Sequence, residues 1–536
     1  MKTNLLILLI SIFSFYTVNA QLSEHIEKGK QAYLKNADKA LHEQIKASKD
    51  INAYIVGDTK TFWRWDLTVM PPQWIQENAS CRAVGDNSYV FVADSEWGSS
   101  MTQQDVDTVI HYLEDVTLAD TSMGIVEMDI HYFGVIPDEL DNDPKVIFYY
   151  SALGTYNGST FDGYFSAFNQ ITETEAQITG DHSNEREMLY MSCNPVDPTS
   201  YSTLSVLSHE LQHLIHFGAD PNEETWLDEG CAEFAMVLFG YPDPIVDFPA
   251  DSDNNLIVWD QQFSDYVQTM LFFTYLSEQT IGPAFITNLV ANTLNGVSGI
   301  NSSLATISYP LNFQEMLSNW TLANYIDDTS LGTAYNYEIL NIPNFASEQY
   351  FGSYPVNNSN SLNACAAHYY QLTANFTSLQ FDFDLSAGGE WDINLIAYQN
   401  LFVKEIIPIS TTTITDFDKP TAYTLTKLML VVTNKEVSTA ETDYSFTVSN
   451  ITDVNLVNRE KLLLYPNPVK ETLNIDNLSN VDFIQINDIL CQTVYVNSDV
   501  NENSFTYNTE GLEKGIYLIS IRYKDNSFET IKFIKE

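Results

Sequence analysis

The stretch that decides the fold is His209-Glu210-Leu211-Gln212-His213, followed by Trp226-Leu227-Asp228-Glu229-Gly230-Cys231-Ala232-Glu233. Two histidines four residues apart on a helix present both imidazoles on one face, one turn apart, where they can bind one zinc ion. Glu210 would then lie beside the metal, ready to accept a proton from water. A catalytic zinc needs a third protein ligand, and Glu229 is the candidate. This pattern predicts a zinc-dependent hydrolase, and among such hydrolases it favours a peptidase.

The residues around both motifs predict helices. Residues 197–200 (Asp-Pro-Thr-Ser) supply turn and cap chemistry for a helix over about 202–217, and a second helix is expected from Trp226 to Phe239. The buried stripe of the first helix consists of leucines spaced by three and four, namely Leu204, Leu207, Leu211 and Leu214. On the second helix, Glu229 and Glu233 share one face. Glu233 can accept a hydrogen bond from the outer ring nitrogen of a zinc histidine.

Two alternatives compete with this interpretation. In a chain with nine histidines, a chance His-Glu-x-x-His arises with a probability on the order of one in a hundred. The second helix could also be an ordinary amphipathic helix that turns its acids to water.

His216 shares the histidine stripe, but a rise of about 10.5 Å from His209 is awkward for two ligands of one zinc. We expect His216 in a cleft wall or partly buried.

The predicted chemistry needs one more group. Zinc would activate water, Glu210 would take its proton and pass it to the leaving amine, and a neutral donor would stabilise the oxyanion. Tyr266, on an expected helix after the ligands, is the candidate donor. The chain contains 31 tyrosines, so a tyrosine near the site could also be there by chance.

The two motifs together resemble the gluzincin group of metallopeptidases, in which the glutamate before the glycine is the third zinc ligand. The chain looks most similar to the hyicolysin-like family of secreted bacterial metallopeptidases, also at residues 184–190 and 266–276. The resemblance covers roughly residues 60–280. It implies a zincin-like α+β catalytic domain with His209, His213 and Glu229 on zinc and Glu210 as the acid/base.

The sequence departs from related families at two points. Fifteen residues separate His213 from Glu229, fewer than in thermolysin-like or aminopeptidase-like relatives. No Gly-x-Met-Glu-Asn element is present, which counts against an aminopeptidase that binds a free amino terminus.

A chain of 536 residues is too long for one core, so we expect several domains. Residues 1–20 have the charged start, apolar run and small-residue end of a secretory signal peptide. Residues 21–50 favour a surface helix or a short pro-segment. Residues 51–345 mix short strands, such as Tyr89–Ala93 and Val146–Tyr150, with helices, which indicates an α+β catalytic domain.

The remaining chain is rich in strands. Residues 346–455 contain Thr-rich and aromatic segments such as Leu379–Phe383 and Lys427–Val432, typical of a β-sandwich appendage. Residues 456–536 resemble the C-terminal sorting domain of the type IX secretion system of Bacteroidetes. The matching segments are 465–468 (Tyr-Pro-Asn-Pro), 473–475, 487–488, 515–517 and 532–535. The resemblance implies export across the outer membrane, whereas a generic β-sandwich adhesion module is the alternative.

Charge and composition exclude several kinds of partner. With 24 basic and 71 acidic residues the formal charge is −47, which disfavours nucleic acid and anionic membrane surfaces. No apolar run after the signal is long enough to span a bilayer. Acidic loops at 141–143 and 247–254 could bind calcium, but neither has EF-hand spacing.

Five scattered cysteines do not form a disulfide framework. In an exported protein one bridge is possible, and Cys81 with Cys193 is the first candidate pair because both precede the zinc helix within the same domain.

The sequence therefore predicts a secreted or cell-surface zinc endopeptidase that acts on proteins or peptides. It predicts a zincin-like α+β catalytic domain, a β-sandwich domain and a small all-β sorting domain that engages the type IX machinery. Two other functions stay open: a zinc hydrolase of non-peptide amides or esters, and a surface adhesin on an inactive peptidase scaffold.

Overall fold

The computed structural model describes residues 26–48, 53–69, 71–156, 159–451, 462–478, 481–490, 492–498, 500, 502–524 and 528–536. The expected signal peptide and Cys491 lie outside these residues. Contacts divide the chain into two compact units, Met1–Asn450 and Ile451–Glu536. Within the described ranges, no helix has the length and apolar character needed to cross a membrane.

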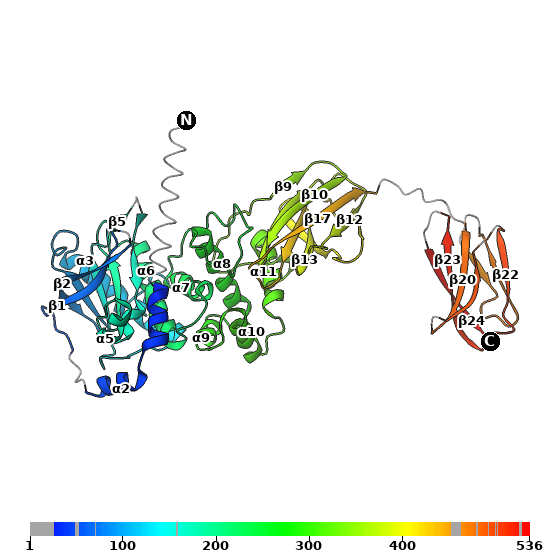
Figure 1. Cartoon of the computed structure of the whole chain (residues 1–536). Coiled ribbons are helices and arrows are strands. Elements are labelled where there is room, and N and C mark those ends of the chain that lie inside the picture. The colour runs from blue at the N-terminus through cyan, green and yellow to red at the C-terminus, as the bar shows by residue number, and fades with distance from the viewer. Residues whose placement is uncertain are drawn as a thin grey trace. The chain divides into compact units, whose positions relative to one another are not determined.

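The first unit contains a mixed six-stranded sheet, whose strands are blue to cyan in Figure 1. Its order is β1 (Thr59–Asp66), β2 (Gln73–Val84), β3 (Ser88–Ala93), β4 (Val146–Ser151), β8 (Met188–Ser192) and β7 (Gly163–Phe165). The central strands β3, β4 and β8 are parallel. All their residues are buried, because such strands are covered on both faces and read as continuous apolar runs. The expected strands at 89–93 and 146–150 are confirmed.

Helices accompany this sheet and continue beyond it. A small hairpin pairs β5 (Thr155–Tyr156) with β6 (Ser159–Thr160). The helices are α3 (Gln103–Glu114), α4 (Ile125–Phe133), α5 (Glu173–Ala176), α6 (Tyr201–Ala219), α7 (Thr225–Phe239), α8 (Phe263–Gln279), α9 (Ala284–Val290), α10 (Gly296–Thr306) and α11 (Phe313–Ile326). In Figure 1 the green helices α8 to α11 lie between the sheet and the strands that follow.

The N-terminal part consists of two helices rather than one. Residues 26–36 form the first and α2 (Lys39–Ser48) the second. The break falls at Asp38, whose Oδ1 accepts a hydrogen bond from the backbone N–H of Leu41 at 3.0 Å and so caps α2. We call residues 26–48 the N-terminal segment.

Two further sheets pack face to face as a sandwich. The four-stranded sheet has the order β10 (Val356–Asn363), β17 (Glu441–Asn450), β12 (Ser378–Asp384) and β15 (Thr415–Asp418). The five-stranded sheet has the order β14 (Phe402–Pro408), β13 (Trp391–Gln399), β16 (Lys427–Asn434), β11 (Ala366–Leu372) and β9 (Gln349–Phe351).

The hydrophobic core continues from the helices into the sandwich. On β16, alternate residues serve different cores: Leu428, Leu430 and Val432 belong to the sandwich core, and Met429 and Val431 to the core of the helices and the first sheet. Period-two alternation thus buries both faces of this strand. This is why residues up to 450 form one unit.

The sandwich also holds the segment that leads into α8. Ser252 Oγ donates to the carbonyl of Ala367 at 2.7 Å, and the backbone N–H of Asn363 donates to Asp253 Oδ1 at 2.8 Å. Strands that come later in the chain thus hold residues 252 and 253, and this fixes the position from which the chain enters α8.

The candidate pairing of Cys81 with Cys193 is wrong. Cys81, Cys193, Cys231 and Cys365 are all free and buried. Cys81 lies on β2 and Cys193 directly after β8, three strand positions away. At about 4.8 Å per strand, their separation is about 14 Å, twice what a disulfide tolerates.

The second unit is all-β. One sheet contains β18 (Leu463–Tyr465), β19 (Thr472–Asp476) and β22 (Ser504–Asn508), and the other β21 (Thr493–Asn497), β20 (Val481–Asp488), β23 (Gly515–Tyr523) and β24 (Phe528–Lys535). Asn467 Oδ1 accepts from the backbone N–H of Ile534 at 2.9 Å, and Asn467 Nδ2 donates to the carbonyl of Lys532 at 3.1 Å. The Tyr-Pro-Asn-Pro segment is therefore bound to the closing strand.

Candidate metal centre

Helix α6 presents the two histidines as its sequence predicts. Ser200 caps it by accepting a hydrogen bond from the backbone N–H of Thr203 at 3.2 Å, and the four stripe leucines are fully buried. Burial of that stripe fixes the rotation of the helix, which leaves His209 and His213 on the adjoining face. The side chains of His209 and His213 are 11% and 12% exposed, so both can line a site that solvent reaches.

Helix α7 brings Glu229 to the same place and is packed tightly against α8. At Gly230, a Cβ would lie 2.4 Å from the ring of Phe273 on α8. The glycine after the glutamate thus permits the close approach of the two helices that carry Glu229 and Tyr266.

Replacement of Gly230 by alanine is expected to destabilise the protein. The added methyl group overlaps a fully buried aromatic ring, and overpacking of a core costs about 1–3 kcal/mol. Chemical denaturation of wild type and Gly230→Ala measures this difference. Gly511→Ala is the matched control, because nothing lies within 4 Å of a Cβ at position 511. A Gly230→Ala variant as stable as wild type would contradict the tight packing of α7 on α8.

Three donor atoms converge between α6 and α7. His209 Nε2 and His213 Nε2 are 3.1 Å apart, and Glu229 Oε2 lies 3.4 Å from the first and 3.6 Å from the second. We call these three atoms the donor triangle. The structure therefore brings together all three residues that the sequence put forward as metal ligands.

The donor triangle has the size that zinc requires. For metal–ligand bonds of about 2.0–2.1 Å, two ligands of a tetrahedral ion are about 3.3 Å apart. Glu229 Oε2 is buried and has no hydrogen-bond partner, so the triangle leaves a strong acceptor unsatisfied. Two imidazoles and one carboxylate form a donor set of catalytic zinc. The residues present fit this ion.

Carboxylates support both histidines from behind. Glu233 Oε1 lies 3.2 Å from His209 Nδ1, so Glu233 is next to the histidine that it is predicted to support. Asp228 Oδ1 lies 3.2 Å from His213 Nδ1. Asp228 is a residue that sequence reasoning missed, although it stands next to Glu229 in the motif.

Two more residues contact Asp228. His216 Nδ1 lies 3.0 Å from Asp228 Oδ1, so this buried histidine faces the supporting carboxylate rather than the donor triangle. Lys30 Nζ, from the N-terminal segment, donates to Asp228 Oδ2 at 2.7 Å. No local pattern in the sequence links residue 30 with residue 228.

The charges around the donor triangle attract a cation. Burial alone would lower the pKa of His213, but Asp228 and Glu229 outweigh it and raise that pKa to about 9. Burial opposes ionisation of Glu229, but the two histidines lower its pKa to about 2. Protons and a metal ion compete for the same atoms, so metal binding at this site releases protons.

Glu210 and Tyr266 complete the surroundings. Burial raises the pKa of Glu210, and His209, His213 and the backbone of Phe165 on β7 oppose this rise. Burial, reinforced by Glu229, Glu233 and Glu210, holds the pKa of Tyr266 well above its ordinary value. Tyr266 is thus a neutral hydroxyl within electrostatic range of the site.

A second group of acids lies elsewhere in the first unit. Carboxylate oxygens of Asp138, Asp141 and Glu187 lie within 4.8 Å of one another, at one of the loops that the sequence put forward for calcium. Arg186 forms an ion pair with Asp141, and Lys46 Nζ lies 3.2 Å from Asp138 Oδ2. Because two of these three carboxylates are paired with the chain's own cations, we assign no ion to the group, and calcium stays a prediction.

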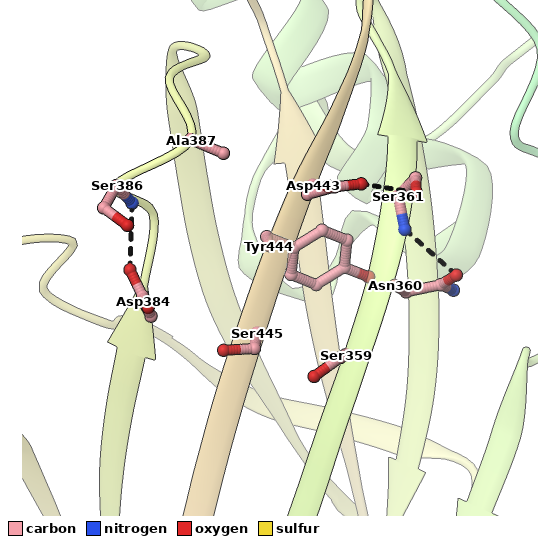
Figure 2. A pocket seen from close by; sticks show the side chains of 9 residues that line it. All are labelled: Ser359, Asn360, Ser361, Asp384, Ser386, Ala387, Asp443, Tyr444 and Ser445. Carbon is pink, nitrogen blue, oxygen red and sulfur yellow. Dashed lines mark hydrogen bonds between the residues drawn. The ribbon is translucent and has the colours of Figure 1, made fainter.

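The sandwich has a polar pocket of about 460 Å³ on its four-stranded sheet (Figure 2). Ser361 Oγ donates to Asp443 Oδ1 at 2.8 Å, and Asp384 Oδ1 accepts from the backbone N–H of Ser386 at 3.0 Å. Asp443 and Asp384 are thus already hydrogen-bonded to neighbouring residues. None of the residues of the donor triangle lines the pocket. The pocket is separate from the candidate metal centre.

Comparisons with known proteins identify one part of the chain. Residues 463–536 match a family described as the secretion system C-terminal sorting domain. This match indicates a protein that is exported to the cell surface or secreted by the type IX system, and whose C-terminal unit engages that machinery. No curated protein matches the chain significantly.

Some solved structures are distantly similar. The adhesin domain of Epf from Streptococcus pyogenes is 8% identical with a TM-score of 0.13, covering 33% of this chain and 76% of that one. The BSP domain of a biofilm associated protein is 9% identical with a TM-score of 0.13, covering 33% and 51%. A β-1,2-glucanase from Parabacteroides distasonis is 14% identical with a TM-score of 0.13, covering 33% and 32%. Similarity at this level says nothing about function.

Proposed function

We propose that this protein is an exported zinc endopeptidase. His209, His213 and Glu229 would hold the ion, and Glu210 would act as acid and base. The donor triangle is the observation that carries the proposal, because its three distances of 3.1, 3.4 and 3.6 Å match one tetrahedral ion. The resemblance of both motifs to gluzincins supports the same assignment.

The chain's own residues would share the work of hydrolysis. A zinc ion supplies Lewis acidity, which polarises a carbonyl and makes water more acidic. Glu210 accepts the proton of the attacking water and returns it to the leaving amine. Tyr266 donates a hydrogen bond to the oxyanion that develops on the substrate. Glu233 lies beside His209 Nδ1 and Asp228 beside His213 Nδ1. These carboxylates keep the Nε2 atoms of both rings in the donor triangle.

A peptide substrate is favoured by the strand beside the site. β7 is one of the two edge strands of the six-stranded sheet, and no described strand pairs with its outer side. It lies against α6, the helix that carries Glu210, and the backbone of its residue Phe165 is close enough to lower the pKa of Glu210. An extended peptide can add to such an edge by main-chain hydrogen bonds, which a small ester or amide cannot do.

Metal analysis of the purified full chain, paired with a protease assay, tests the proposal. We expect zinc bound to the protein, cleavage of casein, loss of cleavage with a chelator and recovery on adding zinc. Small acyl esters and amides assayed in parallel separate the peptidase from the alternative hydrolase. Purified protein without zinc, or casein cleavage indifferent to the chelator, would refute the proposal.

A further inference from the structure

The N-terminal segment is bound to an acidic body largely through its basic side chains. Cation–carboxylate contacts run along both of its helices: Lys28–Asp181 at 2.8 Å, Lys30–Asp228 at 2.7 Å, Lys39–Glu139 at 3.5 Å, His42–Glu175 at 2.8 Å and Lys46–Asp138 at 3.2 Å. In a chain with formal charge −47, five of the 24 Lys and Arg residues fall within the 23 residues of this segment. Charge complementarity therefore orients the segment on the body.

Apolar packing places the first helix of the segment against α6. The ring of Tyr33 meets the ring of Phe217 edge-on, with centroids 4.8 Å apart. Ala32 and Tyr33 are buried. At Gly29, a Cβ would lie 3.1 Å from the ring of Phe168, so the absence of a side chain lets the helix approach. The segment thus packs on the helix that carries both histidines.

Lys30 is more deeply buried than the other ion-paired lysines of the segment. Its side chain is 12% exposed and that of Asp228 is 7% exposed, whereas Lys28 and Lys39 are 43% and 59% exposed. Exposed ion pairs contribute little, but a buried carboxylate depends on its partner. Lys30 is the partner that Asp228 has on its Oδ2 side.

The contact of Lys30 continues to the donor triangle. Lys30 Nζ holds Asp228 Oδ2, Asp228 Oδ1 faces His213 Nδ1, and His213 Nε2 is one corner of the triangle. A carboxylate anchored at one oxygen presents the other in a fixed direction. Released from Lys30, Asp228 can turn away from His213, and the ring loses the contact that orients it.

We infer that Lys30 is a positioning residue of the metal centre, and that the N-terminal segment is retained on the mature protein as part of that centre. This inference rests on the proposed zinc site. It decides between the two interpretations of residues 21–50, because a removable pro-segment would take the anchor of Asp228 with it.

Zinc affinity of the full chain, measured by competition with a chromophoric chelator, tests the role of Lys30. Lys30→Met is expected to bind zinc about 10- to 100-fold more weakly than wild type, the range for loss of a supporting partner. Lys30→Arg, which keeps a charged donor, should recover most of the affinity. Lys28→Met, from the same helix, should bind like wild type. Removing a positive charge would by itself favour a cation, so unchanged or tighter binding by Lys30→Met overturns the inference.

A double variant separates positioning from mere neutralisation of a buried charge. In Lys30→Met/Asp228→Asn no buried charge is left unpaired, so the midpoint of unfolding should return toward that of wild type. Zinc affinity should stay low, because the anchored carboxylate is still missing. Recovery of wild-type zinc affinity in the double variant would show that Lys30 only balances charge.

The exported protein provides a second test. Mass spectrometry of the zinc-loaded protein from culture medium should find peptides from residues 26–48. Zinc-loaded, proteolytically active protein that begins after residue 48 would overturn the retention of the segment. Wild-type protein that binds no zinc is a different outcome, since it refutes the proposed function itself.

Discussion

Replacement of Glu210 by glutamine is expected to abolish proteolysis while zinc remains bound. The substitution keeps the size of the side chain but removes its capacity to accept a proton. Loss of a positioned general base costs about 10²- to 10⁴-fold in rate, and Glu210 serves in both proton transfers of the proposed reaction. The measurement is kcat/KM on fluorescent casein, combined with the zinc content of the same preparation.

The control for this variant must distinguish catalysis from binding. Glu127→Gln, an exposed position on α4, should leave both activity and zinc content unchanged. Glu210→Gln should retain zinc with near wild-type affinity, because the Glu210 carboxylate is not one of the donor atoms. Casein hydrolysis by Glu210→Gln at the wild-type rate would remove Glu210 from the mechanism.

Local spacing explains why the donor triangle could be predicted from the sequence. Histidines at i and i+4 share a face in any α-helix, and the leucine stripe tells which face is buried. Glu229 required more, because its position depends on the packing of α7 on α6. The motif around Glu229 supplied this information, and the structure places Glu229 Oε2 3.4 and 3.6 Å from the two histidine nitrogens.

The parts that the sequence did not predict depend on long-range packing. The Lys30–Asp228 contact joins residues 198 positions apart, and neither residue carries a pattern that points to the other. The disulfide prediction failed for the same reason, because nothing local reveals that β3 and β4 separate β2 from β8. Likewise, the apolar run 428–432 indicates a buried strand but not that its two faces belong to different cores.

Replacement of Glu229 by glutamine is expected to remove most of the zinc affinity. A neutral amide oxygen is a poorer zinc ligand than a carboxylate, and the charge that balances two histidines and a dication is lost. The loss should exceed the roughly 10- to 100-fold that follows when only a supporting partner is removed. Chelator competition measures the affinity, and Glu233→Gln, which loses the contact with His209, provides the comparison.

The same variant changes how zinc affects folding. Zinc at 1,000 times its Kd stabilises the native state by about 4 kcal/mol, so wild type should unfold at a clearly higher temperature with zinc than with a chelator. In Glu229→Gln this difference should shrink toward zero at the same zinc concentration. Affinity should therefore fall in the order wild type, Glu233→Gln, Glu229→Gln. If Glu229→Gln binds zinc more tightly than Glu233→Gln, the third ligand is not Glu229, since removing a ligand cannot cost less than removing the support of another.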